Sequence, residues 1–376
     1  MNRIQFYIKY IFRNQKGGYS NWRFYFPLLG FTFGIIAVIL TFATMKGMER
    51  EVFRKIEAIN FTSKILDTEF IKPNNENFLF TIYRKAIVSN EGEFRVINVR
   101  SIENFHLFKY NILSDFLLET SNDSNGVILG SGLAYKLRVS VGDSIQITSP
   151  TDVSFMTGIP TSVKVKISGI FNLKLLNYDD NYIFTKISLG ESLFKSSDKE
   201  IHSYLTSTQI KLNYPSVKSI MSWKDVHPDF ISAMNLEKIA FSTFGFLIIL
   251  LSAFSSFSIM CLAVIRRVSE LGILRTLGYS KNMIAGIYFL QSLIIGLIGG
   301  MIGIIVSKIF IKLDESNNFI EKLFSSDIIF NFKLNISNLE IFTIYMIGLL
   351  IMLLAGIYPS IYASHIPILK SLNYNK

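Results

Sequence analysis

The sequence predicts an integral membrane α-helical protein with four transmembrane helices and a large α+β extracytoplasmic domain carried on stalk helices. Three observations lead to this fold class. Half of the 376 residues are hydrophobic, the apolar residues gather in four long uncharged runs, and a long polar segment separates the first two runs. The runs cover residues 24–45, 239–265, 283–307 and 341–363. Because about 20 apolar residues span the hydrocarbon core of a bilayer as a helix, each run predicts one transmembrane helix.

The first run is expected to be a retained helix rather than a cleaved signal peptide. Its apolar part is too long, its basic lead extends to residue 23, and no small-residue cleavage site follows it. Apolar residues recur at helical spacing through residues 46–60, so this helix is expected to continue beyond the membrane as an amphipathic stalk. Residues 229–238, before the second run, suit a matching stalk. The stalks are either plain surface helices or levers that join membrane to domain, and periodicity alone does not decide between them.

Basic residues at the ends of the runs predict the orientation of the chain. Residues 1–23, the 266–282 connector and the 364–376 tail carry lysines and arginines with a single acidic residue among them. Positively charged segments stay in the cytoplasm, so both termini are expected there. The 308–340 connector holds lysines and acidic residues together and is a mild opposing signal. The net charge of +10 then largely reflects topology, and the scattered basic residues do not suggest nucleic-acid binding.

Residues 61–228 are expected to form the α+β domain. Alternation of polar and apolar residues predicts strands at 77–89, 94–102, 144–149, 162–170 and 208–213. Short helices are expected at 131–137 and at 188–195, the latter opened by Ser188 and Glu191 as a capping pair. The stretch NYDDNY (177–182) is typical of a turn.

The sequence offers no group with which this chain would catalyse a reaction. It lacks a G-x-x-x-x-G-K-[ST] phosphate loop, a G-x-S-x-G nucleophile motif and a closely spaced histidine pair, so no cofactor or metal is expected. The only cysteine, Cys261, falls inside the second run. No charged residue interrupts the four runs, which argues against an ion path. Gly296, Gly299, Gly300 and Gly303 instead predict close helix–helix contact.

The 266–282 connector, RRVSELGILRTLGYSKN, predicts a short helix over 266–278. Val268, Leu271 and Leu274 form an apolar stripe on it, and Arg267 and Glu270 lie within or beside that stripe. A helix resting on lipid would separate its charges from its apolar face, so this mixture favours a protein groove. Gly278 should end the helix and Ser280 should cap the next one. An ordinary basic loop remains the alternative on pattern alone.

Several motifs resemble those of type VII ABC-transporter permeases, in order along nearly the whole chain. ELGILRTLGYS (270–280) resembles the family signature E-I-G-I-L-K-T-L-G, and MKGMERE (45–51) resembles M-N-G-F-E-R-E. GVILGSGLAYKLRVSVGDSIQITSP (126–150), SW at 222–223 and YPSIYASHIPILKSLNY (358–374) are similar to further family elements. The branch that the chain most resembles is the lipoprotein-release (Lol) permeases LolC, LolE and LolF.

The resemblance implies a non-catalytic subunit of the bacterial inner membrane with several partners. A cytoplasmic ABC ATPase dimer would bind ATP and Mg, and a second permease copy or a paralogue would complete the transporter. An acylated lipoprotein would be the substrate, and a periplasmic lipoprotein carrier would accept it. The 61–228 domain and the 308–340 connector would then be periplasmic. The residues expected to couple to the ATPase are Arg267, Glu270, Leu271, Ile273, Leu274, Arg275 and Gly278.

The stretch SPTDVSFMTGIPTSVKV (149–165) resembles the hook Q-F-T-P-M-G-R-I-P with which LolC-like permeases recruit the carrier. An exposed apolar loop tip is expensive unless it meets a partner. The proline inside the family pattern is missing here, and a hairpin tip packed on its own domain remains the alternative. The hook residues would be Phe155, Met156, Gly158 and Pro160.

The lipid path is expected at the outer ends of the first two transmembrane helices. Adaptable methionines and aromatic rings suit variable acyl chains, although plain helix packing uses the same residues. The residues expected there are Phe42, Met45, Met48, Phe241 and Phe244. Two other functions stay open: a macrolide-exporter-like permease that drives a periplasmic machine, and an FtsX-like permease that signals without transport.

Overall fold

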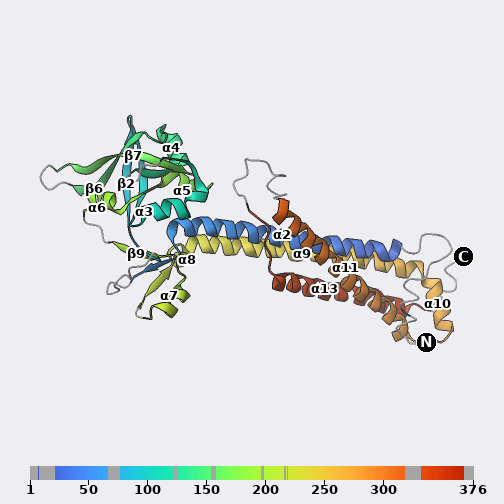
Figure 1. The fold of residues 1–376 in the computed structure, drawn as a ribbon. Coiled ribbons are helices and arrows are strands. Elements are labelled where there is room, and N and C mark those ends of the chain that lie inside the picture. The colour runs from blue at the N-terminus through green and yellow to red at the C-terminus, as the bar shows by residue number, and fades with distance from the viewer. Residues whose placement is uncertain are drawn as a thin grey trace. The chain divides into compact units, whose positions relative to one another are not determined.

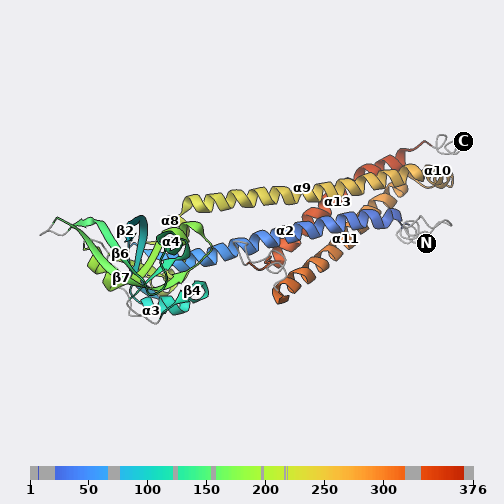
Figure 2. The ribbon, with the colours of Figure 1, turned by 90° about the horizontal axis from the view of Figure 1, so that it is seen from above.

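The computed structural model of the chain (Figures 1 and 2) forms two compact units. It describes residues 7, 22–66, 77–121, 126–153, 158–195, 199–215, 217, 219–317 and 332–367. The helical unit comprises Met1–Arg50 and Ala233–Lys376, and the sheet unit comprises Glu51–Ser232.

Four long helices carry the apolar runs. They are α2 (Trp22–Asn60), α9 (Pro228–Arg266), α11 (Lys281–Asn317) and α13 (Asn338–His365). Each is long and apolar enough to cross a membrane, which confirms the prediction of four such helices. Large apolar side chains stay exposed on them, among them Leu251 and Phe342. Exposed groups of this kind suit a lipid environment.

Small residues let these helices pack closely. A side chain at Gly34 of α2 would collide with Ser252 of α9, and one at Gly356 of α13 would collide with Ser292 of α11. The α11 glycines predicted to make helix contacts do so, since Gly300 lies against Tyr345 of α13. Without a hydrophobic driving force between helices in lipid, such close approach is a main source of association energy.

A few side-chain hydrogen bonds add to this packing. The Ser256 hydroxyl of α9 donates to the Pro27 carbonyl of α2 over 3.1 Å. Ser337 and Glu340 form a capping box that starts α13.

The described strands of the sheet unit form one sheet of ten strands. Their order is β10-β1-β9-β2-β3-β8-β5-β7-β4, and β6 pairs with β2 and β7. The strands are β1 (Ser63–Ile65), β2 (Phe78–Asn90), β3 (Glu93–Ile102), β4 (Leu117–Thr120), β5 (Val127–Gly130), β6 (Ser144–Val153), β7 (Pro160–Phe171), β8 (Tyr182–Lys186), β9 (Glu200–Ser203) and β10 (Ile220–Ser222). Most neighbours are antiparallel, whereas β3 with β8 and β5 with β7 are parallel. Two buried apolar clusters hold the sheet and its helices together, one around Val99 and Ile147 and one around Phe108 and Phe184.

Short helices connect the strands. They are α3 (Phe105–Leu107), α4 (Ser131–Leu137), α5 (Leu176–Asn181), α6 (Ile187–Leu193), α7 (Ser207–Asn213) and α8 (Trp223–Val226), with a π-helix at Phe108–Ile112 and a 3-10 turn at Ser114–Phe116. The strands predicted at 77–89, 94–102, 144–149 and 162–170 are confirmed as β2, β3, β6 and β7. The helix predicted at 131–137 is confirmed as α4.

Three local predictions are wrong. Residues 208–213 form helix α7 instead of a strand, because a capping box between Thr206 and Gln209 starts a helix there. Most of the predicted turn at 177–182 falls in helix α5, and its last residue, Tyr182, begins β8. Helix α6 begins at Ile187, one residue before Ser188, so Ser188 does not cap it.

Candidate functional site

The 266–282 connector folds as the predicted short helix. Helix α10 (Val268–Thr276) lies between α9 and α11. Gly278 adopts φ +90°, and the Tyr279 N–H bonds to the Leu274 carbonyl over 3.1 Å, which ends the helix in the manner that a glycine allows. Ser280 accepts from the Met283 N–H over 3.3 Å and so caps α11 as expected.

The apolar stripe of α10 faces the protein's own helices. Val268 and Leu271 are buried, and Leu271 packs in a cluster with Ile284 of α11 and Ala363 of α13. Leu274, half-buried, packs against the same cluster. The stripe therefore anchors α10 to the neighbouring helices α11 and α13 through protein contacts.

A second contact anchors α10 to α13. Arg275 donates from Nη1 to the Ser364 carbonyl oxygen over 3.1 Å. Carbonyl groups in the last turn of a helix have no partner within the helix, and a cation there is favourable. Arg275 therefore bonds to the end of α13 within the same chain.

The outward surface of α10 is partly apolar. Ile273 and Leu277 have 52% and 70% of their surface exposed. Glu270 is half-buried and lies 3.9 Å from the Arg267 guanidinium, oxygen Oε2 to Nε. Exposed apolar side chains beside charged groups are typical of a protein-docking surface. We call Glu270, Ile273, Leu277 and Gly278 the connector face.

Five of the seven predicted coupling residues fall into two groups, and the other two, Arg267 and Glu270, are half-buried and lie 3.9 Å apart. Leu271, Leu274 and Arg275 contact the chain's own helices, whereas Ile273 and Gly278 are exposed. Leu277 was not predicted, although its spacing of four residues from Ile273 places both on one helical face.

The described residues of the predicted hook, Gly158 and Pro160, lie where strand β7 begins. The last register pair is Val153 with Pro160, and beyond it Gly158 adopts φ +66° and is exposed. Ile159 has 63% of its surface exposed. Phe155 and Met156 lie outside the described residues. The described part of the hairpin tip thus presents Gly158, Ile159 and Pro160 to solvent.

Part of the helical unit matches a known protein family, and most of the chain matches known proteins. Residues 242–368 match the family model of the FtsX-like permease C-terminal domain. The chain is 27% identical to the lipoprotein-releasing system transmembrane protein LolC of Buchnera aphidicola, over 89% of this chain and 90% of that protein. It is 24% identical to LolE of Haemophilus influenzae over the same shares, and 22% identical to LolC of Neisseria meningitidis over 79% of each chain.

These matches together support a Lol-type ABC permease. The matched FtsX-like segment contains most of α9, all of α10, α11 and α13, and therefore the whole connector. The LolC and LolE matches extend over the sheet unit as well, because they cover most of the chain.

The predicted lipid-path residues are split between interior and surface. Phe42 of α2 lies against Gly245 of α9, and Met45 is buried. Met48 and Phe241 are half-buried, whereas Phe244 has 62% of its surface exposed. The two helices are also joined by an ion pair between Glu49 and Lys238, at 2.6 Å.

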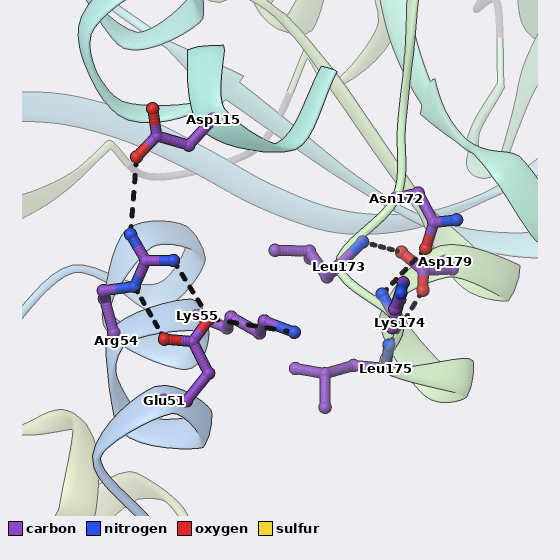
Figure 3. Close-up of polar contacts among 9 residues, drawn as sticks. All are labelled: Glu51, Arg54, Lys55, Asp115, Asn172, Leu173, Lys174, Leu175 and Asp179. Atoms are coloured by element: carbon purple, nitrogen blue, oxygen red, sulfur yellow. Dashed lines mark hydrogen bonds and ion pairs between the residues drawn. The ribbon is translucent and has the colours of Figure 1, made fainter. Parts of the chain in front are cut away.

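The last turns of α2 belong to the sheet unit. Figure 3 shows Arg54 of this segment with Glu51 and Asp115. Arg54 donates to both carboxylate oxygens of Glu51, at 2.9 and 3.0 Å, and to Asp115 at 3.3 Å. Its guanidinium also lies over the Phe116 ring, 5.2 Å from the centroid. These contacts fix the end of α2 to the segment that precedes β4.

The adjacent aspartates of α5 make separate contacts within the sheet unit, and those of Asp179 are drawn in Figure 3. Asp179 accepts from the backbone N–H groups of Leu173 and Leu175, both at 2.8 Å. Burial raises the pKa of Asp179, and these two hydrogen bonds oppose the rise. Asp180 pairs instead with Lys136 at 2.7 Å. Among the described residues, no three acidic, histidine or cysteine side chains gather as a metal site would require.

Proposed function

We propose that this Lol-type permease extracts acylated lipoproteins from the outer leaflet of the bacterial inner membrane and passes them to a periplasmic carrier. The support is the similarity to LolC and LolE proteins along most of the chain. In this proposal the permease subunit is itself non-catalytic, and a separate ATPase dimer binds ATP and Mg and supplies the energy.

The single observation that supports coupling between the ATPase and this chain is the exposed connector face. Ile273 and Leu277 are exposed on a helix whose opposite stripe is packed into the helical unit. A groove of the cytoplasmic ATPase would cover these side chains and contact Glu270. Because α10 is also bonded to the end of α13, movement of the groove would shift the transmembrane helices as a body.

The proposed topology places both termini and α10 in the cytoplasm, with residues 61–228 and 308–340 in the periplasm. The basic residues of the connector support this orientation. A second permease copy or a paralogue would face this chain and enclose the lipoprotein's acyl chains between them. Phe42, Met45, Met48, Phe241 and Phe244 are the residues that we assign to that path, and the α2 and α9 stalks would transmit closure.

We assign the carrier contact to the β6–β7 hairpin tip. Gly158 and Pro160 flank the exposed Ile159, and Phe155 and Met156 complete the proposed hook. An exposed apolar side chain at a loop tip is stabilised when a partner covers it.

A retention assay tests the transport function. The permease and its ATPase are purified together in an uncharged detergent and immobilised, and an acylated lipoprotein is applied beside the same protein without acyl chains. We expect retention of the acylated form only, and its release on addition of ATP. The permease alone should show no ATP hydrolysis until the ATPase is added.

The same assay separates the two other functions. Equal retention of the acylated and non-acylated proteins would contradict lipoprotein extraction and favour a macrolide-exporter-like permease. Absence of any ATP-dependent release, with ATPase binding intact, would favour an FtsX-like signalling role.

A further inference from the structure

The sheet unit contains a cavity of about 260 Å³, to which the proposed transport function assigns no role. It lies where α2 ends and where β1, β3 and β9 meet α8. Its wall includes Lys64, Arg100, Glu200 and His202 beside the rings of Tyr83 and Trp223. Small-ligand sites are concave and hold polar groups that converge on the ligand. This cavity is lined mostly by polar and charged side chains, with aromatic rings and Val226 beside them.

Arg100 of β3 is the central group of the cavity. It has only 6% of its surface exposed, and its guanidinium lies between the rings of Tyr83 and Phe61, 5.1 and 5.7 Å from their centroids. Nη1 donates to the carbonyl oxygen of Ile59, near the end of α2. Nε is buried and has no hydrogen-bond partner among the described residues. No described carboxylate forms an ion pair with this arginine.

A buried arginine without a counter-charge is unusual, because burying an unpaired charge is strongly unfavourable. The cation–π contacts and the helix carbonyl offset part of that cost. The helix-capping role alone would use one nitrogen of the guanidinium and would not require a cavity beside it. The arrangement therefore suits an anion that enters from the cavity.

The other charged groups of the cavity neutralise each other. Lys64 pairs with Glu200 at 2.6 Å, and Glu200 also bonds to Nε2 of His202 at 3.1 Å. Burial lowers the pKa of His202 and of His227, so both rings are neutral near pH 7. The charge of Arg100 is thus the one that the described lining leaves uncompensated.

Two hydroxyl groups add donors beside this charge. The Tyr83 and Tyr182 hydroxyls lie 3.4 Å apart on the cavity wall. Burial raises the pKa of Tyr182, so its hydroxyl stays protonated and can donate to an anion. A singly charged oxyanion would match both the charge and the donors, since phosphate and carboxylate oxygens are the acceptors that arginine prefers.

We propose that this cavity is a binding site for a singly charged oxyanion, a phosphodiester or a carboxylate, carried on a small organic molecule. The volume exceeds that of a bare ion, and the Trp223 ring and Val226 give the remainder of the molecule an apolar wall. The site is separate from the connector face and does not depend on the transport function.

Trp223 provides the measurement, because it lines the cavity and is one of only two tryptophans in the sequence. The full chain with Trp22→Phe is purified in an uncharged detergent at low salt. Its fluorescence is followed during titration with glycerophosphoglycerol as the phosphodiester, acetylglycine as the carboxylate, and choline as a cation control. We expect a saturable change with one of the two anions and none with choline. The anion that saturates identifies the source of the oxyanion.

Three variants connect the signal to the arginine. Arg100→Gln should weaken binding at least about tenfold, since a hydrogen bond to a charged group is lost. Arg100→Lys keeps the charge but loses the planar fork, and should weaken binding less. Glu200→Gln removes the one negative charge and should tighten binding several-fold. A merely structural role for Glu200 predicts no tightening.

Several results would overturn the proposal. They are the absence of a saturable response to both anions, a response to choline equal to that of the anions, and a folded Arg100→Gln variant that binds as the parent does. If Arg100→Gln does not fold, Glu200→Gln decides: unchanged or weakened binding in that variant contradicts an anion site.

Discussion

The guanidinium of Arg275 in α10 donates a hydrogen bond to the main-chain carbonyl oxygen of Ser364 in α13, over 3.1 Å. The two residues are far apart in the sequence, yet this bond and the cluster around Leu271 join the connector to the end of the last apolar helix. A force applied to the connector face would therefore be transmitted to α13 by side-chain packing and by one charged hydrogen bond. This relationship gives Arg275 a role inside the permease, distinct from direct contact with an ATPase.

Arg275→Ala should uncouple the connector from α13. The lost hydrogen bond involves a charged group, so the local cost is roughly 1.5–3 kcal/mol. We expect stimulation of the partner ATPase by substrate to fall several-fold, and Arg275→Lys to restore part of it. The stimulation is measured as the rate of steady-state ATP hydrolysis in the reconstituted transporter, with and without substrate. Arg266→Ala is the matched control, because Arg266 is an exposed basic residue at the end of α9. Equal loss in both variants would point to net charge instead.

Glu270→Lys should abolish coupling without unfolding the chain. Glu270 lies on the connector face, and its ion pair with Arg267 at 3.9 Å is partly exposed and worth at most about 1 kcal/mol. Thermal unfolding should therefore change little, whereas substrate-stimulated ATP hydrolysis should disappear. Glu237→Lys, which makes the same change at an exposed position of α9, should leave both quantities unchanged. Retained coupling in Glu270→Lys would count against the groove contact.

Gly34→Ala should force α2 and α9 apart. A methyl group at Gly34 would lie 2.6 Å from the Ser252 Cβ, which cannot rotate away. Overpacking of this kind costs about 1–3 kcal/mol. Gly30→Ala, one turn earlier in the same helix, meets nothing within 4 Å and gains about 1 kcal/mol of helix propensity at most. The midpoint of thermal unfolding should thus fall for the first variant and hold or rise for the second. A fall of similar size in both would mean that Gly34 is not a packing site.

The long helices of the helical unit were predictable because each is encoded by one continuous apolar run of the sequence. A long uncharged run that crosses a bilayer on its own must form a helix, because only a helix satisfies its backbone hydrogen bonds there. Gly278 and Ser280 were predictable as helix ends because each acts on backbone groups of neighbouring residues. Residues 208–213 were mispredicted because Ile210 and Leu212 alternate with polar residues as in a strand. The capping residues Thr206 and Gln209 outweigh that alternation.

The cavity of the sheet unit could not be predicted from the sequence. Lys64, Arg100 and Glu200 come from three strands that lie far apart in the chain, and each looks like an ordinary surface residue in its own segment. Only the pairing of β1 and β2 with β9, and of β2 with β3, brings them together. Likewise, the spacing within α10 predicts an apolar stripe but does not tell whether that stripe faces a partner or the chain itself.

Glu200 should make the sheet unit sensitive to acid. Burial favours a higher pKa for Glu200, but hydrogen bonds from His202 and Lys64 outweigh it and lower the pKa from 4.5 to about 2. A carboxylate whose pKa is lower in the folded state adds stability above its unfolded pKa. That stability is lost as the pH falls from 4.5 toward about 2. Because the side chain is partly exposed, we expect a loss of about 2 kcal/mol in this window.

Urea unfolding of the full chain in detergent, followed by Trp223 fluorescence in the Trp22→Phe background, measures this loss at about pH 6 and about pH 3. Glu200→Gln should be less stable than the parent at both values, and the gap should be smaller at the lower one. At that pH the unfolded chain already has most of this carboxyl protonated, whereas the folded state, with a pKa of about 2, still holds most of it ionised against Lys64. Glu191→Gln, at an exposed carboxylate that pairs with Lys199, should follow the parent at both values. If the gap between the parent and Glu200→Gln stays constant across this range, the Lys64–Glu200 pair does not stabilise the fold through its charge.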